Sequence, residues 1–163
     1  MSHNSDFKDT QKDHPDILTL ERFLPYRLSI LSNRISAIIA ETYKDKFALS
    51  IVEWRIMAVL GEYPGASADE VSAKIQIEKS IVSRALQKLL KRHLVVREVD
   101  QSDRRRQNLT LTKTGTDVYK QIVPVSYDYE EGLLNCFNDD ERDIFNGLID
   151  RLYEHAETVK IKS

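Results

Sequence analysis

The chain has 163 residues, enough for one domain with helical extensions and a sizeable hydrophobic core. A net charge of −2 excludes a wholly basic nucleic-acid coat protein, and no apolar run approaches the ~20 residues that span a bilayer. The single cysteine, Cys136, excludes an intramolecular disulfide framework and fits a reducing compartment, so we expect a cytoplasmic protein.

The first part of the chain predicts a tail followed by a long amphipathic helix. Residues 1–16 are polar and lack the apolar core of a secretion signal, so we expect a disordered tail. Pro25 suits the first turn of a helix, where a missing N–H costs nothing. Four- and three-residue steps then separate Leu24, Leu28, Leu31, Ile35 and Ile38. This spacing is typical of helix pairing, and it predicts a dimerisation segment at 17–48, although an intramolecular bundle would show the same pattern.

Two capping signatures open the middle of the chain. Ser50 precedes Glu53 by three residues, and Ser67 precedes Glu70 in the same way, so each pair predicts the start of a helix. The first helix is expected to bury Trp54, Met57 and Leu60 and to stop at residues 64–65, which are Pro and Gly. The second helix leads by a tight turn into a third at 78–92, which predicts a helix-turn-helix.

The helix at 78–92 has two unlike faces. Its apolar face carries Val82, Ala85, Leu86 and Leu89 at three- and four-residue steps. The opposite face carries hydroxyl, amide and cationic groups: Ser80, Ser83, Arg84, Gln87, Lys88 and Lys91. Such groups reach phosphates and base edges, and no acidic residue lies between Lys79 and Arg92. This helix is therefore predicted to read DNA.

A β-hairpin is expected directly after this helix. Residues 95–99 and 109–112 alternate in polarity, and the polar segment between them contains three consecutive arginines. From Lys79 to Arg106 there are nine Lys and Arg against three Asp and Glu, so this segment carries +6 and the rest of the chain −8. A basic island on an acidic body turns one face toward a polyanion, so we interpret the hairpin as a DNA-binding wing; an ordinary charged surface turn is the alternative.

The last third of the chain predicts two long helices. Thr112 and Asn138 are suitable N-caps. The apolar stripes that follow are Val118, Ile122, Val125 and Tyr129, and then Phe145, Leu148, Leu152, Ala156 and Val159. The apolar stripes of these two helices and of the N-terminal helix are more than a small DNA-reading unit can bury. Residues 113–163 are therefore predicted to complete an isologous homodimer interface.

These residues resemble the MarR family of winged-helix regulators over most of the chain from about Leu24. The most specific pieces are Leu49-Ser50 with Glu53-Trp54-Arg55, then Ser83-Arg84, and then Asp103-Arg104-Arg105 followed by residues 109–112 and Gly115. The resemblance implies a mainly α fold with a small β-hairpin wing (α+β), a winged helix-turn-helix at 49–112 and a helical dimerisation layer from both ends. It also implies a homodimeric, ligand-responsive transcription factor, usually a repressor. One departure is His93, which stands where the family usually has a glycine.

The candidate partners are a pseudo-palindromic double-stranded operator, a second copy of the chain and a small-molecule effector. The candidate DNA contacts are Lys79, Ser80, Ser83, Arg84, Gln87, Lys88 and Lys91 on the helix and Asp103, Arg104, Arg105 and Arg106 in the hairpin. The resemblance assigns Arg105 to the minor groove, steadied by Asp103. The candidate effector residues are Tyr26, Ser29, Asn33, Trp54 and Arg55, which supply an aromatic wall, hydroxyls and a cation for a carboxylate. Relatives with a similar Glu-Trp-Arg helix suggest an aromatic acid.

Other function classes find little support. The sequence has no nucleophile elbow, P-loop, glycine-rich dinucleotide turn or His-Glu metal motif, so we expect neither an enzyme nor a cofactor. His93 and His155 stand alone, which disfavours a metal site. Cys136 has no adjacent basic residue to lower its pKa, which disfavours a redox sensor. The remaining alternative is a winged-helix scaffold whose basic face meets an acidic protein.

Replacing Arg105 by alanine tests the wing. We expect Arg105→Ala to weaken operator binding strongly without lowering the melting temperature, because the lost contact is to DNA and not within the fold. Gel-shift titration and thermal melting measure the two effects. Unchanged affinity at physiological salt would remove the wing from the interface.

Overall fold

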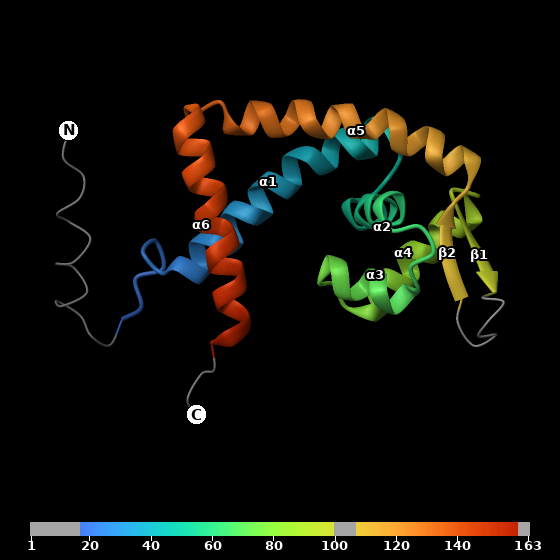
Figure 1. Cartoon of the computed structure of the whole chain (residues 1–163), viewed down its shortest axis with the longest axis horizontal. Coiled ribbons are helices and arrows are strands. Elements are labelled where there is room, and N and C mark those ends of the chain that lie inside the picture. The colour runs from blue at the N-terminus through green and yellow to red at the C-terminus, as the bar shows by residue number, and fades with distance from the viewer. Residues whose placement is uncertain (1–16, 100–106, 160–163) are drawn as a thin grey trace.

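The computed structural model describes residues 17–99 and 107–159, and over this part the chain is mainly α with one small antiparallel sheet. This is the predicted fold class. The elements are α1 (Leu24–Phe47), α2 (Ile51–Glu62), α3 (Ala68–Ile75), α4 (Lys79–Lys91), β1 (Val95–Val99), β2 (Gln107–Leu111), α5 (Lys113–Leu134) and α6 (Asp139–Thr158). α2, α3, α4 and the sheet form a head, while α1, α5 and α6 extend away from it (Figure 1). We call these three helices the helical layer.

The predicted caps start the helices. Ser50 and Glu53 form a reciprocal capping box on α2, with the Ser50 N–H donating to Glu53 Oε2 over 2.7 Å. Ser67 and Glu70 do the same for α3, as do Asn138 and Glu141 for α6. The Thr112 hydroxyl accepts from the Gly115 N–H and so caps α5. Each cap satisfies N–H groups that have no partner within the helix and contributes about 1 kcal/mol.

The hydrophobic core lies in the head. The four apolar residues predicted for the inner face of α4 are all buried, and they pack with Leu49, Ile56, Met57, Leu60 and Val71 in one cluster. Trp54 differs from the prediction, because it is only half-buried at the rim of this cluster while Ile56 is fully buried. The indole therefore remains available at the junction between the head and the helical layer.

The hairpin follows α4 as predicted. β1 pairs with β2 in antiparallel register, with Val95 opposite Leu111 and Val99 opposite Gln107, so β2 begins two residues earlier than expected. Backbone bonds also join β2 to the turn after α2: Gly65 N–H donates to the Leu109 carbonyl and Leu109 N–H to the Ala66 carbonyl. The hairpin is thus attached to the head along β2.

The structure at the end of α4 shows how His93 fits where the family pattern has a glycine. His93 adopts the left-handed conformation (φ 55°) that usually takes glycine at a helix end. Its carbonyl accepts from the Thr112 hydroxyl over 2.7 Å, and the Leu94 carbonyl accepts from the Thr112 N–H over 3.0 Å. The helix therefore stops where the family pattern requires, with histidine in place of glycine.

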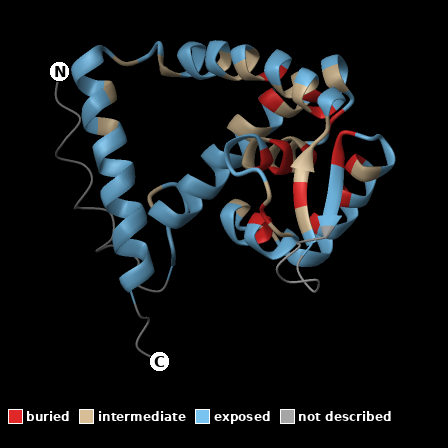
Figure 2. Cartoon of the chain, turned by 45° about the vertical axis from the view of Figure 1, so that its right-hand side comes forward, coloured by how far each residue is buried: buried red, intermediate tan, exposed pale blue. Residues whose placement is uncertain are grey.

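The helical layer is mostly exposed in the single chain (Figure 2). α6 has no buried residue, and Leu28, Leu31, Leu148 and Leu152 are each at least 42% exposed. Two long-range bonds attach α1 to α5: the Tyr43 hydroxyl meets the Ser126 hydroxyl over 2.8 Å, and the Tyr129 hydroxyl donates to the Ile35 carbonyl over 2.8 Å. The apolar stripes predicted on α1 and α6 are therefore largely uncovered in one chain, whereas the predicted stripe of α5 packs inward, with Ile122 fully buried.

Gly115 tests the joint between the hairpin and α5. A Cβ at this position would overlap the Leu94 carbonyl oxygen, a backbone atom that cannot move alone. We expect Gly115→Ala to lower the free energy of unfolding by about 1–3 kcal/mol, the cost of overpacking.

The matched control is Gly147→Ala in α6, where an added Cβ meets no atom within 4 Å. Because alanine favours helix over glycine, this change should stabilise the protein by about 0.5–1 kcal/mol. Urea unfolding measures both, and equal effects of the two substitutions would contradict the close approach at Leu94.

Candidate nucleic-acid interface

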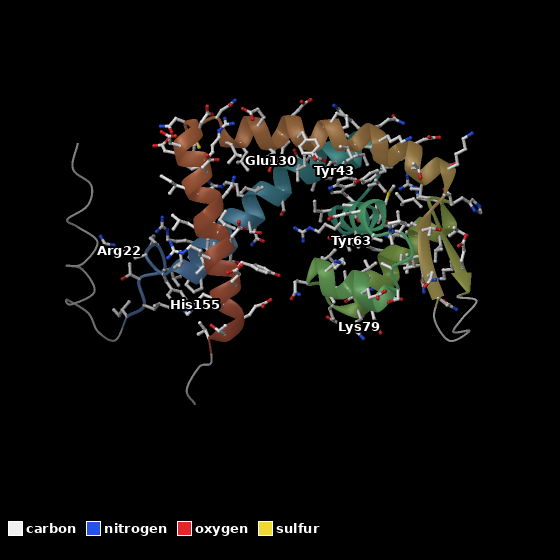
Figure 3. The ribbon with its side chains drawn as sticks, in the orientation of Figure 1. Arg22, Tyr43, Tyr63, Lys79, Glu130 and His155 are labelled. Atoms are coloured by element: carbon white, nitrogen blue, oxygen red, sulfur yellow. The ribbon has the colours of Figure 1, made fainter. Side chains whose placement is uncertain are left out.

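The polar face of α4 is exposed along its whole length. The burial of its apolar face against the head turns the opposite side outward, and every candidate DNA contact on the helix is exposed: Lys79, Ser80, Ser83, Arg84, Gln87, Lys88 and Lys91. Lys79 lies on the side of the head opposite α5 (Figure 3). The helix thus presents one continuous surface of hydroxyl, amide and cationic groups.

Local bonds hold parts of this face without burying it. The Ser80 hydroxyl donates to Glu78 Oε1 over 2.6 Å, and Arg84 Nε donates to the Ser80 carbonyl over 3.3 Å. Lys79 Nζ lies 2.8 Å from Asp69 Oδ1, with both side chains about three-quarters exposed. An ion pair that exposed stabilises by only about 0–1 kcal/mol, so a phosphate can displace the Asp69 carboxylate. Sequence reasoning did not find Asp69, which lies on another helix.

The predicted wing contacts fall at the hairpin tip. Asp103, Arg104, Arg105 and Arg106 lie outside the described residues, and their contribution stays a prediction. The strands on either side fix only where the tip leaves β1, after Val99, and where it returns, at Gln107.

The candidate effector residues divide into two groups. Trp54 packs between two tyrosine rings, with centroid distances of 5.2 Å to Tyr43 and 5.8 Å to Tyr119. Arg55 Nη2 donates to the Ser36 hydroxyl over 3.4 Å. Both α2 residues therefore meet the helical layer, Trp54 through α1 and α5 and Arg55 through α1. Burial raises the pKa of Tyr43 above its usual range, against a smaller lowering by its bond to Ser126, so the phenol stays protonated at neutral pH.

The other group lies farther along α1. Tyr26, Ser29 and Asn33 share one helical stripe with Ser36, but Tyr26 is about 15 Å from Ser36 along the axis at 1.5 Å per residue. Tyr26 borders a separate cavity of about 290 Å³ that neither Trp54 nor Arg55 lines. The structure thus brings Arg55 to Ser36 at one end of this stripe, and it places Tyr26 at the other end. Sequence reasoning missed Ser36, although its three-residue step from Asn33 was a usable signal.

Among residues 17–99 and 107–159, no group of three or more His, Cys, Asp and Glu side chains is arranged to hold a metal ion. None of the helices in these same ranges is both long enough and apolar enough to cross a membrane. Cys136 is exposed, and its Sγ lies 3.7 Å from the Leu133 carbonyl oxygen.

Comparison with known proteins gives one consistent family. The sequence profile of the MarR family matches residues 49–106, nearly the whole predicted reading head. The HTH-type transcriptional regulator BilQ from Clostridium symbiosum (strain WAL-14163) is 23% identical over 113 residues, which cover 69% of this chain and 77% of that protein.

Solved structures agree over a larger part of the chain. A MarR protein from Peptoclostridium difficile is 26% identical, with a TM-score of 0.78 over 87% of this chain and 92% of that one. FabT from Streptococcus pneumoniae, solved in complex with DNA, has the same fold at 21% identity, with a TM-score of 0.70 over 84% of this chain and 97% of that one.

Proposed function

Because the chain belongs to the MarR family of DNA-binding transcriptional regulators, we propose that it binds a pseudo-palindromic operator as a homodimer and represses transcription until a small anionic ligand releases it. The family consists of regulators and not enzymes, which confirms the predicted class of function. One observation carries the DNA-binding part of the proposal: the inner face of α4 is buried, and every polar candidate on its outer face is exposed.

The exposed face divides by chemistry. Ser80, Ser83, Arg84 and Gln87 carry the groups that pair with base edges, and we assign them to the major groove. Lys79, Lys88 and Lys91 end in compact ammonium groups, which suit phosphates. A protein that only met an acidic partner would need the charges but not this row of hydroxyl and amide groups. FabT, which has the same fold, is solved in complex with DNA, and this supports DNA as the partner of the chain.

Arg84→Ala tests base reading by α4. The loss of one base contact costs about 1–3 kcal/mol, so we expect a fall in operator affinity of about 5- to 150-fold with relaxed preference at one base position. Fluorescence anisotropy with the operator and with single-base variants measures both effects.

The control for Arg84→Ala is Lys120→Ala, which removes an exposed cation from α5. It should leave affinity for the operator nearly unchanged. If the two variants weaken binding equally and uniformly across sequences, α4 acts only through general charge.

The dimer proposal rests on uncovered apolar surface. Along α6, Leu148, Ile149 and Leu152 share one face with Phe145, and they are 52%, 47% and 42% exposed. Leu24, Leu28 and Leu31 on α1 are exposed to a similar degree. An apolar surface of this kind on both terminal helices favours a self-complementary interface, since burial contributes about 25 cal/mol per Å².

A charged residue within this surface is expected to separate the copies. Leu152→Arg should convert the dimer to a monomer at micromolar concentration, because an arginine there would be desolvated without a partner. Asp150→Arg, which introduces the same residue on the opposite face of α6, should remain dimeric. Sedimentation velocity distinguishes these states, and a wild-type chain that sediments as a monomer would rule out the dimer.

The ligand proposal places an aromatic carboxylate at the Trp54–Arg55 junction. Within the part of the chain that the structure describes, the Arg55 guanidinium bonds only a neutral hydroxyl, at 3.4 Å, and a carboxylate would make a shorter charge-assisted bond. Trp54 packs against Tyr43 of α1 and Tyr119 of α5, so a ligand wedged beside it would change the angle between head and layer. To shift a 1:99 equilibrium fully, the ligand needs about 5.5 kcal/mol of differential affinity.

Calorimetry with a panel of aromatic acids, including benzoate and salicylate, tests this junction. We expect heat of binding with the wild type and none with Arg55→Ala, since the carboxylate loses its cation. Arg151→Ala, a change on α6, should behave as wild type. Identical isotherms for wild type and Arg55→Ala would exclude Arg55 from the site.

A further inference from the structure

A second, strongly cationic cavity lies where α1, α2 and α4 meet. It is open to solvent, has a volume of about 810 Å³ and is bordered by the end of α1, the start of α2 and the last turn of α4. Its charged lining residues are Lys44, Lys88, Lys91, Arg92 and Glu53. The formal charge of this lining is +3, and none of the effector residues discussed above borders it.

Arg92 forms a fixed part of this cavity. Its Nη1 donates to the Ala48 carbonyl over 2.7 Å and its Nη2 to the Phe47 carbonyl over 3.0 Å. These carbonyls end α1 and have no partner within the helix, so the guanidinium serves as a C-cap from 44 residues away. The bonds connect the last turn of α4 directly to α1, and they hold one cation at the cavity wall.

The three lysines of the cavity lack acidic partners. Within residues 17–99 and 107–159, none of Lys44, Lys88 and Lys91 makes an ion pair. The acidic neighbour, Glu53, is 5% exposed, and its carboxylate already accepts from the Ser50 N–H in the capping box. Several positive charges in one concave site repel one another. A cleft lined by charges of one sign also concentrates counter-ions. The site is therefore poised for an anion.

The apolar residues that line the cavity favour one class of anion over another. Ala40, Ala48 and Ile51 contribute apolar surface beside the ammonium groups. An inorganic ion would gain nothing from that surface, whereas an organic acid would cover it. The volume also lies within the range of small-molecule sites, about 300–1,000 Å³.

We propose that this cavity binds an organic monoanion with a short apolar body, its acid group among Lys44, Lys88 and Lys91 and its body against Ala40 and Ile51. The regulatory consequence rests on the proposed function. Lys88 and Lys91 are assigned above to DNA phosphates, so an anion held between them removes positive charge from the flank of α4 and weakens operator binding.

Calorimetry of the full-length protein with hexanoate tests the site, with hexan-1-ol as the neutral probe of the same shape. We expect hexanoate to bind and hexan-1-ol to give no heat. Lys44→Gln should weaken hexanoate binding at least tenfold, because Lys44 belongs to the cavity and not to the DNA contacts. Lys120→Gln, which removes a cation elsewhere, should leave binding unchanged, and circular dichroism checks that both variants fold.

Two further results separate this cavity from the Trp54–Arg55 junction. Arg55→Gln should retain hexanoate binding, and amide shifts of Ser50 and Ile51 on titration should be lost in Lys44→Gln. Equal binding of hexan-1-ol, no binding of hexanoate, or loss of binding in Arg55→Gln would each overturn the proposal.

The effect of hexanoate on DNA binding is measured in a separate experiment. Hexanoate should lower operator affinity of wild type in a gel shift but not that of Lys44→Gln. Calorimetric binding at this cavity in a protein that forms no DNA complex would refute the proposed function while supporting the site. Operator binding by a protein that gives no heat with hexanoate would support the proposed function and refute the cavity site.

Discussion

The burial of one face of α4 determines how the rest of the molecule can act. Val82, Ala85, Leu86 and Leu89 lie between 0% and 7% exposed, and each buried side chain of the larger kinds contributes about 1.5–3 kcal/mol. The ion pair Lys79–Asp69 on the opposite side contributes at most about 1 kcal/mol. Apolar packing therefore orients the helix, and its polar face remains exposed.

The C-terminal end of α4 connects the helix to its surroundings. At its C-terminal end, His93 turns the chain into β1, and the contacts of Thr112 and Gly115 with residues 93–94 fix the start of α5. Arg92 at the same end caps α1. α4 is thus joined to two of the three helices of the helical layer within a few residues.

Much of this arrangement could be predicted from local sequence. The capping boxes at Ser50 and Ser67 and the apolar face of α4 depend on residues three or four apart, and they were predicted at the correct positions. The sequence pattern placed the start of β2 at residue 109, two residues after its true start at Gln107, because Gln107 and Asn108 carry no apolar alternation. Strand pairing depends on the opposite strand as well, which a local pattern does not contain.

Contacts between distant segments were not predicted. The bonds of Arg92 to the end of α1 span 44 residues, and nothing near either partner in the sequence signals them. The half-buried state of Trp54 depends likewise on Tyr43 and Tyr119, which approach from two other helices. The cationic cavity is built in the same way, from three elements whose charges look like ordinary surface charges when read along the chain.

Hydroxyl-radical footprinting of the operator tests the central claim most directly. A dimer that presents two copies of α4 to one side of the duplex should protect two patches of the sugar–phosphate backbone on that side, about one helical turn apart, 10–10.5 bp centre to centre or a multiple of it. Both patches should disappear together in Leu152→Arg. A single protected patch that persists in that variant would contradict the account.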